Sequence, residues 1–136
     1  EKFLGHDPVM NMDGAQVFDF TLKRVPVMIE KIMEEASVTS SDIDHFVLHQ
    51  PNKYILQNIK KRMKLTDEKV PHLTQSVYGN QNSASIPGTI NGFLSNGYSR
   101  RCLTSVVAGF GIGLSWGAGI IKTENIYAPK TFHLGE

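Results

Sequence analysis

The sequence predicts an α/β fold: a mixed, mostly parallel sheet with packed helices and a closing antiparallel hairpin. Two observations lead to this prediction. Helical and strand patterns alternate along most of the chain, which is typical of parallel strands that helices connect. Near the end, two apolar runs flank the glycine-rich segment 109–113, which is typical of a hairpin turn. The 136 residues are enough for one domain with one core.

The first predicted helix covers residues 16–36. Its apolar residues recur at intervals of three and four, so they share one face that a sheet can cover. Pro26 lies within this pattern, so we expect a kink or two abutting helices there. The apolar face consists of Phe18, Leu22, Val25, Ile29, Ile32, Met33 and Ala36.

A short apolar strand at 46–48 ends at His49. Pro51 cannot donate to a ladder, and Asn52 is a good N-cap for a helix that extends to about Leu65. His49 therefore lies where a strand ends and a helix begins. In α/β sheets this carboxyl edge is where ligands bind, although a histidine there can equally be a core residue with a hydrogen-bond partner.

Downstream, residues 70–77 show some alternation and are interpreted as a strand. Ser85 is the expected cap of a third helix that ends near Gly97. Gly88 and Gly92 weaken that helix, which indicates close packing against a neighbour.

The hairpin is predicted from strands at 101–108 and 114–121. The expected domain covers residues 14–122. It lies between an N-terminal arm, 1–13, and a C-terminal tail, 123–136.

Composition excludes several classes. Apolar and charged contents of 40% and 20% are ordinary for globular proteins, and a net charge of +1 gives no field directed at nucleic acid. The single cysteine, Cys102, excludes an intrachain disulfide and fits a reducing compartment, so we expect a cytoplasmic location. We expect no membrane span and no signal peptide. Since the first residue is Glu1, we expect a processed chain or a piece of a longer one.

The helix after His49 carries five basic residues and no acidic one. A solvated face is the simplest interpretation, and a face for an acidic partner is the alternative. Nucleic acid is the weaker choice of partner, because no groove-reading motif is present. The basic residues are Lys53, Lys60, Lys61, Arg62 and Lys64.

Three motifs in order give a resemblance to a known family. They are His-Gln-Pro-Asn at 49–52, Gly-Asn-Gln-Asn-Ser-Ala-Ser at 79–85 and Gly-Phe-Gly-Ile-Gly-Leu-Ser-Trp-Gly-Ala at 109–118. Together they resemble the C-terminal half of the thiolase-fold condensing enzymes, and β-ketoacyl-acyl-carrier-protein synthase III most closely. The resemblance covers most of residues 14–122. The first strand of that half is missing, so the expected fold is an incomplete half.

The resemblance implies an acyltransferase of fatty acid biosynthesis. In that family a cysteine takes an acyl group from a thioester, and a histidine and an asparagine assist decarboxylation of malonyl-carrier protein. His49 and Asn80 match these two residues. The family's cysteine lies in the N-terminal half, and Cys102 is not its counterpart. The resemblance assigns the oxyanion hole and pocket to Phe110, Gly111, Ile112 and Gly113.

The resemblance also implies partners: acyl carrier protein, acyl-coenzyme A, malonyl thioesters and a second copy of the chain, without a cofactor, nucleic acid or membrane. Carrier proteins of this class are acidic, so the five basic residues become candidate docking residues, and Lys61 matches a family position most directly. Pro51, Gln81, Asn82 and Ile112 depart from the family's usual residues and leave room for a different product.

Other interpretations remain open. A metal site is not expected, since His45 and His49 on one strand would lie about 13 Å apart at roughly 3.3 Å per residue. A Ser-His-Asp hydrolase lacks its Gly-x-Ser-x-Gly motif here. A non-catalytic thiolase-like domain, used for pairing or for carrier-protein binding, is the remaining alternative.

Overall fold

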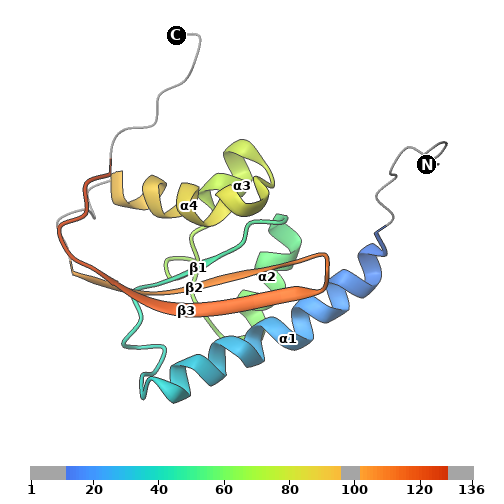
Figure 1. Cartoon of the computed structure of the whole chain (residues 1–136), viewed down its shortest axis with the longest axis horizontal. Coiled ribbons are helices and arrows are strands. Elements are labelled where there is room, and N and C mark those ends of the chain that lie inside the picture. Colours follow the sequence, from blue (N-terminus) through green and yellow to red (C-terminus); the bar gives the residue numbers. More distant parts are fainter. Residues whose placement is uncertain (1–11, 96–101, 129–136) are drawn as a thin grey trace, which may run out of the picture.

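A three-stranded sheet lies between two layers of helices in the computed structural model, which describes residues 12–95 and 102–128 (Figure 1). In chain order the elements are α1 (Gly14–Glu35), β1 (His45–Leu48), α2 (Lys53–Arg62), α3 (Leu73–Tyr78), a 3₁₀ turn (Asn82–Ala84), α4 (Ser85–Phe93), β2 (Leu103–Gly111) and β3 (Ser115–Thr123). Asp13 caps α1, and Asn52 caps α2 as expected, because its side chain accepts a hydrogen bond from Ile55 N–H at 2.9 Å.

The sheet has the order β1-β2-β3 and is mixed. β1 pairs with β2 in parallel, with Leu48 opposite Ala108, and β2 pairs with β3 antiparallel, with Phe110 opposite Trp116. The predicted hairpin is confirmed, but its strands are longer than expected at their carboxyl ends. Phe110 therefore lies in β2 and not in the turn. Gly113 in the turn has φ +134°, a conformation that favours glycine.

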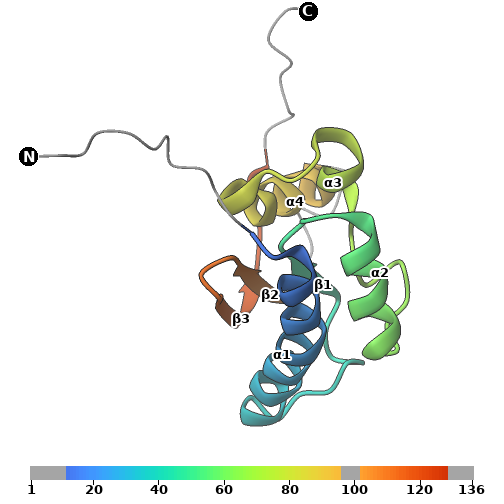
Figure 2. The same ribbon diagram turned by 90° about the vertical axis from the view of Figure 1, so that its right-hand side faces the viewer.

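The two helical layers cover opposite faces of the sheet. Figures 1 and 2 show α1 and α2 on one face and α3 and α4 on the other. β1 alternates accordingly: Phe46 and Leu48 pack in the cluster under α1 and α2, while Val47 packs with Phe93 and Leu103.

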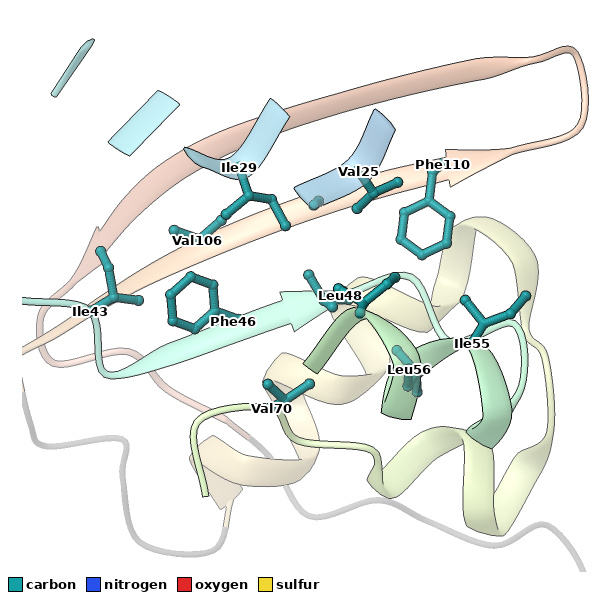
Figure 3. Packing of buried hydrophobic residues seen from close by; sticks show 12 residues of the cluster. Val25, Ile29, Ile43, Phe46, Leu48, Ile55, Leu56, Val70, Val106 and Phe110 are labelled. Atoms are coloured by element: carbon teal, nitrogen blue, oxygen red, sulfur yellow. The ribbon is translucent and has the colours of Figure 1, made fainter. Parts of the chain in front are cut away.

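The apolar face predicted for α1 is confirmed for most of its residues, but Ala36 is exposed beyond the end of the helix. Val25 and Ile29 are fully buried, and Phe18, Leu22 and Met33 pack against the same cluster. Figure 3 shows Val25 and Ile29 lying over β2, beside the side chains of β1. α1 is one helix through Pro26, so the prediction of two abutting helices is wrong. Proline removes one helical hydrogen bond, but a helix of 22 residues keeps its other bonds and its packing.

The strand predicted at 70–77 is wrong, because α3 occupies most of this segment. Short apolar runs do not distinguish the helical repeat of about 3.6 residues well from the strand repeat of about 2. Val70 and Thr74 are buried, whereas His72 and Ser76, which would share their face in a strand, are exposed, so the burial does not follow strand alternation. The residue just before this segment does contact the sheet, because Phe46 N–H donates a hydrogen bond to Lys69 O at 2.6 Å.

α3 packs closely on α4. The hydroxyl groups of Thr74 and Thr89 form a buried hydrogen bond of 2.8 Å. A Cβ atom on Gly88 would lie 3.2 Å from Gln81 Oε1 and 3.3 Å from Thr74 Cγ2, so the close packing expected at Gly88 is confirmed, with a neighbour inside this chain. The end predicted for this helix, Gly97, lies outside the described residues.

The terminal segments are covered only in part. Residues 1–11 of the predicted arm, 129–136 of the predicted tail and position 101 at the start of the first hairpin strand lie outside the described residues. Within the part that is described, no helix is long and apolar enough to cross a membrane.

Two substitutions on α1 test this packing. Ile29→Ala removes a fully buried side chain, so we expect a loss of about 2–5 kcal/mol in unfolding free energy. Val27→Ala, on the exposed side of the same helix, is the control and should change it by less than about 0.5 kcal/mol. Urea unfolding measures both. Equal losses would contradict the assigned face.

Candidate active site

His49 lies directly beyond β1, at the carboxyl end of the parallel strand pair. Its backbone N–H donates to Ala108 O at 2.8 Å, so the parallel ladder continues to this residue. Its half-buried ring meets the ring of Phe110 edge-on, with 5.4 Å between the ring centres. β1 and β2 together therefore fix the position of His49, at the sheet edge that the sequence predicted.

Asn80 follows α3, because this helix replaces the strand predicted at 70–77. Gly79 ends α3 with φ +73°, which favours glycine and turns the chain toward the cleft. Asn80 Oδ1 then accepts a hydrogen bond from Asn82 N–H at 2.9 Å. Because the oxygen end of the amide is held in this way, its NH₂ end is left to donate elsewhere.

These two loops and the hairpin meet in one cleft of about 430 Å³. His49, Asn80, Phe110, Gly111 and Ile112 all line it, so the structure brings together five of the residues that the sequence singled out. Gly113 lines neither this cleft nor the hollow beside it. The adjoining hollow of about 550 Å³ shares His49, Asn82 and Phe110–Ile112 with the cleft and extends over Trp116.

Sequence reasoning missed the part of the cleft that α1 supplies. The lining residues from the first turns of this helix are Gly14, Val17 and Thr21, and Met12 joins them from two residues before its start. Only tertiary packing brings this end of α1 beside the carboxyl end of β1, and no motif marks these residues. Asn82 also lines the cleft and was noticed only as a departure from the family pattern.

The cleft and the adjoining hollow are electrostatically neutral. No Asp, Glu, Lys or Arg among the described residues lines either one. Burial lowers the pKa of His49 below its ordinary value of 6.5, and the nearby backbone of Asn82 partly opposes this shift. His49 is therefore neutral at pH 7 and can act as a hydrogen-bonding group without carrying charge.

Cys102 is not an activated nucleophile. It is exposed, and its thiol donates a hydrogen bond to a carboxylate oxygen of Glu124 at 3.5 Å, which raises the pKa of the thiol. It precedes β2, seven residues before Gly109, which corresponds to about 23 Å at roughly 3.3 Å per residue. The cysteine is thus at the wrong end of the strand and lacks the thiolate character that attack requires.

The basic residues on and after α2 do not form one uniform face. Lys60 forms an ion pair with Asp67 and its side chain is only 22% exposed. Lys64 has φ +54° and lies beyond the end of the helix. The expectation that it belongs to the basic face of this helix is therefore wrong. Lys61 and Arg62 are exposed on the last turn.

No group of three or more His, Cys, Asp or Glu side chains in the described ranges could hold a metal ion.

Comparisons with known proteins agree with this geometry. Residues 33–123 match the family described as 3-oxoacyl-[acyl-carrier-protein (ACP)] synthase III C terminal. The chain is 41% identical over 113 residues to a β-ketoacyl-[acyl-carrier-protein] synthase III of Microcystis aeruginosa, covering 83% of this chain and 34% of the relative. It is 35% identical over 118 residues to that of Prochlorococcus marinus, covering 87% and 35%.

A solved structure gives the same answer. The crystal structure of 3-oxoacyl-(acyl carrier protein) synthase III from Pseudomonas aeruginosa PAO1 matches with a TM-score of 0.80 and 30% identity, over 86% of this chain and 37% of that one. The fold is that of the thiolase-like enzymes, as the motifs predicted. The chain belongs to the family of C-terminal domains of 3-oxoacyl-[acyl-carrier-protein] synthase III. It spans about a third of the length of the curated relatives it matches.

The neutral histidines predict a pH dependence of stability. Burial is the main cause that lowers the pKa values of both His45 and His49, so the unfolded chain binds more protons than the folded one below about pH 6.5. The unfolding free energy should be at its full value above pH 6.5 and should fall as the pH drops through that value toward the lowered pKa values.

Urea unfolding between about pH 7.5 and about pH 5 checks this dependence. The carboxylates with lowered pKa values, Asp13, Asp42 and Asp67, act in a more acidic range. His49→Gln should reduce the change in unfolding free energy between about pH 7.5 and about pH 5. A stability that rises as the pH falls through this window would contradict the neutral state assigned to the ring.

Proposed function

We propose that this chain supplies the decarboxylation part of a β-ketoacyl-acyl-carrier-protein synthase III-type acyltransferase, and that the nucleophilic cysteine comes from a part outside this chain. The observation that carries the proposal is the convergence of His49 and Asn80 in a cleft that no charged side chain of the described residues lines. The names of the relatives, which specify a synthase acting with acyl carrier protein, support the reaction class.

In the proposed reaction, malonyl thioester loses its carboxylate as carbon dioxide. The electron pair of the broken carbon–carbon bond moves into the thioester, and negative charge develops on the thioester oxygen. The Asn80 amide and the His49 ring are neutral donors that stabilise this enolate without protonating its carbon. The carbon then attacks an acyl group on the cysteine, a new carbon–carbon bond forms, and the cysteine leaves as thiolate.

The neutral lining of the cleft favours loss of carbon dioxide. Among residues 12–95 and 102–128, no Lys or Arg lines the cleft to form an ion pair with a carboxylate bound there, while Phe110 and Ile112 present apolar surface. The starting carboxylate is thus poorly stabilised compared with the enolate, whose charge faces the donors. In this proposal the backbone N–H of Ile112, in the hairpin turn, assists as an oxyanion donor for the acyl transfer step.

We also propose acyl carrier protein, acyl-coenzyme A and malonyl thioesters as partners, a cytoplasmic location and self-association. For the carrier protein, Lys61 and Arg62 become the principal docking residues and Lys53 and Lys64 their neighbours. Lys60 has a carboxylate partner of its own and is a weaker candidate. The exposed apolar residues Val27, Ile112, Leu114 and Trp116 support pairing of this chain with another surface.

A second candidate is a non-catalytic domain that pairs with a partner or binds a carrier protein. The poorly reactive setting of Cys102 favours it, since no thiol of this chain can carry the acyl group. A cysteine-bearing partner part that is acylated only when this chain is present would favour the enzyme. Binding without any decarboxylation would favour the non-catalytic domain.

Alanine substitutions of the two donors test the proposed chemistry. In the assembly of this chain with a cysteine-bearing part, His49→Ala and Asn80→Ala should each slow malonyl-coenzyme A decarboxylation about a hundredfold, because one enolate donor is lost. Acylation of the cysteine should change little. His72→Ala and Asn58→Ala replace the same residue types away from the cleft and should keep the parental rate.

Release of labelled carbon dioxide and mass spectrometry of the acylated cysteine measure these two steps separately. Parental decarboxylation rates in both donor variants would show that the site is assigned wrongly.

Charge reversal on α2 tests the docking proposal. Lys61→Glu with Arg62→Glu should weaken binding of acyl carrier protein about tenfold, because two attractions to an acidic surface become repulsions, and added salt should weaken the unaltered chain similarly. Lys23→Glu with Lys31→Glu on α1 makes the same change in net charge on another helix and should have little effect. Surface plasmon resonance measures the affinities, and equal losses in both double variants would leave only a non-specific charge effect.

A further inference from the structure

We propose that β3 and α1 together form a two-fold interface through which a second copy of this chain binds. This inference rests on the self-association in the proposed function and deepens it by naming the surface, but it does not depend on the proposed chemistry. β3 is an edge strand, because it pairs with β2 on one side and no described strand lies on its other side. Figures 1 and 2 show β3 as the outer strand of the sheet, with α1 packed along one face.

The edge that β3 presents is long and open. None of its nine residues is buried, whereas its neighbour β2 has buried residues along its whole length, and Trp116 of β3 is 47% exposed. Folded proteins usually protect such an edge with charges or prolines, because its free N–H and C=O groups can pair with another chain. Lys122 is the only charged residue of β3, so this strand has little of that protection.

The sequence of β3 is complementary to itself when two copies run antiparallel. Outward-pointing backbone groups alternate along an edge strand, so only a register that pairs odd positions with odd and even with even joins them. Pairing centred on Gly119 meets this condition and uses all nine residues. It sets Ala118 opposite Ile120 of the second copy, and Trp116 opposite Lys122, whose ammonium group can lie on the indole face.

The side of α1 beside this edge has the same kind of symmetry. A single stripe of the helix, with residues at spacings of three and four, lines a groove of about 350 Å³ together with Trp116 and Ala118 of β3. The positions in this stripe are symmetric about a point between residues 29 and 30. The stripe consists of Arg24, Val27, Met28, Lys31, Ile32 and Glu35.

The two ends of the stripe carry opposite charges. When two copies of α1 run antiparallel, Arg24 lies opposite Glu35 of the second copy, and by symmetry this ion pair forms twice. Both side chains are exposed, and Glu35 forms a loose ion pair of 3.8 Å with Lys31 in its own helix. Because the stripe carries both signs at matching positions, its charges favour a second copy over a partner of one sign.

The middle of the stripe is apolar. Val27, which is 51% exposed, lies opposite Ile32 of the second copy, and Met28 lies opposite the aliphatic stem of Lys31. The dimer therefore buries apolar side chains that are exposed or half-buried in the single chain.

One two-fold axis serves both pairings. Rotation about an axis perpendicular to the sheet reverses strand and helix together and leaves both copies of α1 on the same face. α1 packs on β2 as well as β3, so its axis lies about one strand spacing from the two-fold axis. Two copies of α1 would then lie about 10 Å apart, close to the usual distance between packed helices.

The two patterns also lie at similar levels along the molecule. Phe20 of α1 meets the ring of Trp116 edge-on, with 5.1 Å between the ring centres. From this contact the centre of the helical stripe lies about 14 Å farther along α1, and Gly119 lies about 10 Å farther along β3. The two centres therefore fall within about one helical turn of each other.

Sedimentation velocity of the full chain from about 1 to about 200 µM tests the proposal, since this range brackets weak association. An interface of one strand and one helix from each copy is small, so we expect a dissociation constant on the order of 10 µM and a mostly monomeric chain below about 1 µM. Trp116 is the only tryptophan of the sequence, so its fluorescence reports on this surface. Its emission should shift to shorter wavelength as the dimer forms, because the ring loses contact with water.

Charge exchange tests the helix pair. Arg24→Glu and Glu35→Arg should each weaken the dimer about tenfold, since each turns two attractions into two repulsions, and the variant with both changes should restore it. Lys23→Glu and Glu34→Arg are the matched controls. They make the same changes in charge at neighbouring exposed positions that do not line the groove, and they should leave the dimer intact.

A chain that stays monomeric over the whole concentration range would overturn the proposal. So would a Trp116 emission that does not change on association, or a double variant that dimerises as weakly as the single ones. No readout here uses malonyl-coenzyme A, so a failed interface would leave the proposed chemistry standing, and a failed decarboxylation assay would leave the interface standing.

Discussion

The candidate site depends on one constraint, the parallel pairing of β1 with β2 up to its last hydrogen bond, from His49 N–H to Ala108 O. This pairing places His49 beside Phe110 and the start of the hairpin turn. The clusters on the two faces of β1 hold the pairing in register, because a slip of one residue would exchange Val47 with Phe46 and Leu48 between the faces.

The proposed chemistry depends on the lack of charged residues lining this edge, among those described, as well as on His49 and Asn80. Helix α1 closes the cleft with apolar and small residues, and its charged residues lie elsewhere on its surface. Asn82 contributes its backbone N–H, which holds the oxygen of the Asn80 amide, so the candidate site depends on the conformation of a turn as well as on side chains.

The sequence predicted most of this site, because His49, Asn80 and Phe110 lie in motifs and each motif follows or precedes a recognisable apolar run. It failed where tertiary packing decides. The segment at 70–77 has apolar residues compatible with either period, and packing on α4 through Thr74 selects the helix. The contribution of α1 to the cleft, through Thr21 and its neighbours, has no local signal at all.

The central claim is that His49, Asn80 and the hairpin turn form one thioester-binding site. Titration of the ¹⁵N-labelled chain with an amide analogue of a malonyl thioester, which resists decarboxylation, tests it most directly. The account predicts that the Asn80 side-chain NH₂, the His49 ring and the Ile112 backbone N–H shift together along one saturation curve. Shifts confined to residues around α2, or separate curves for these three groups, would contradict it.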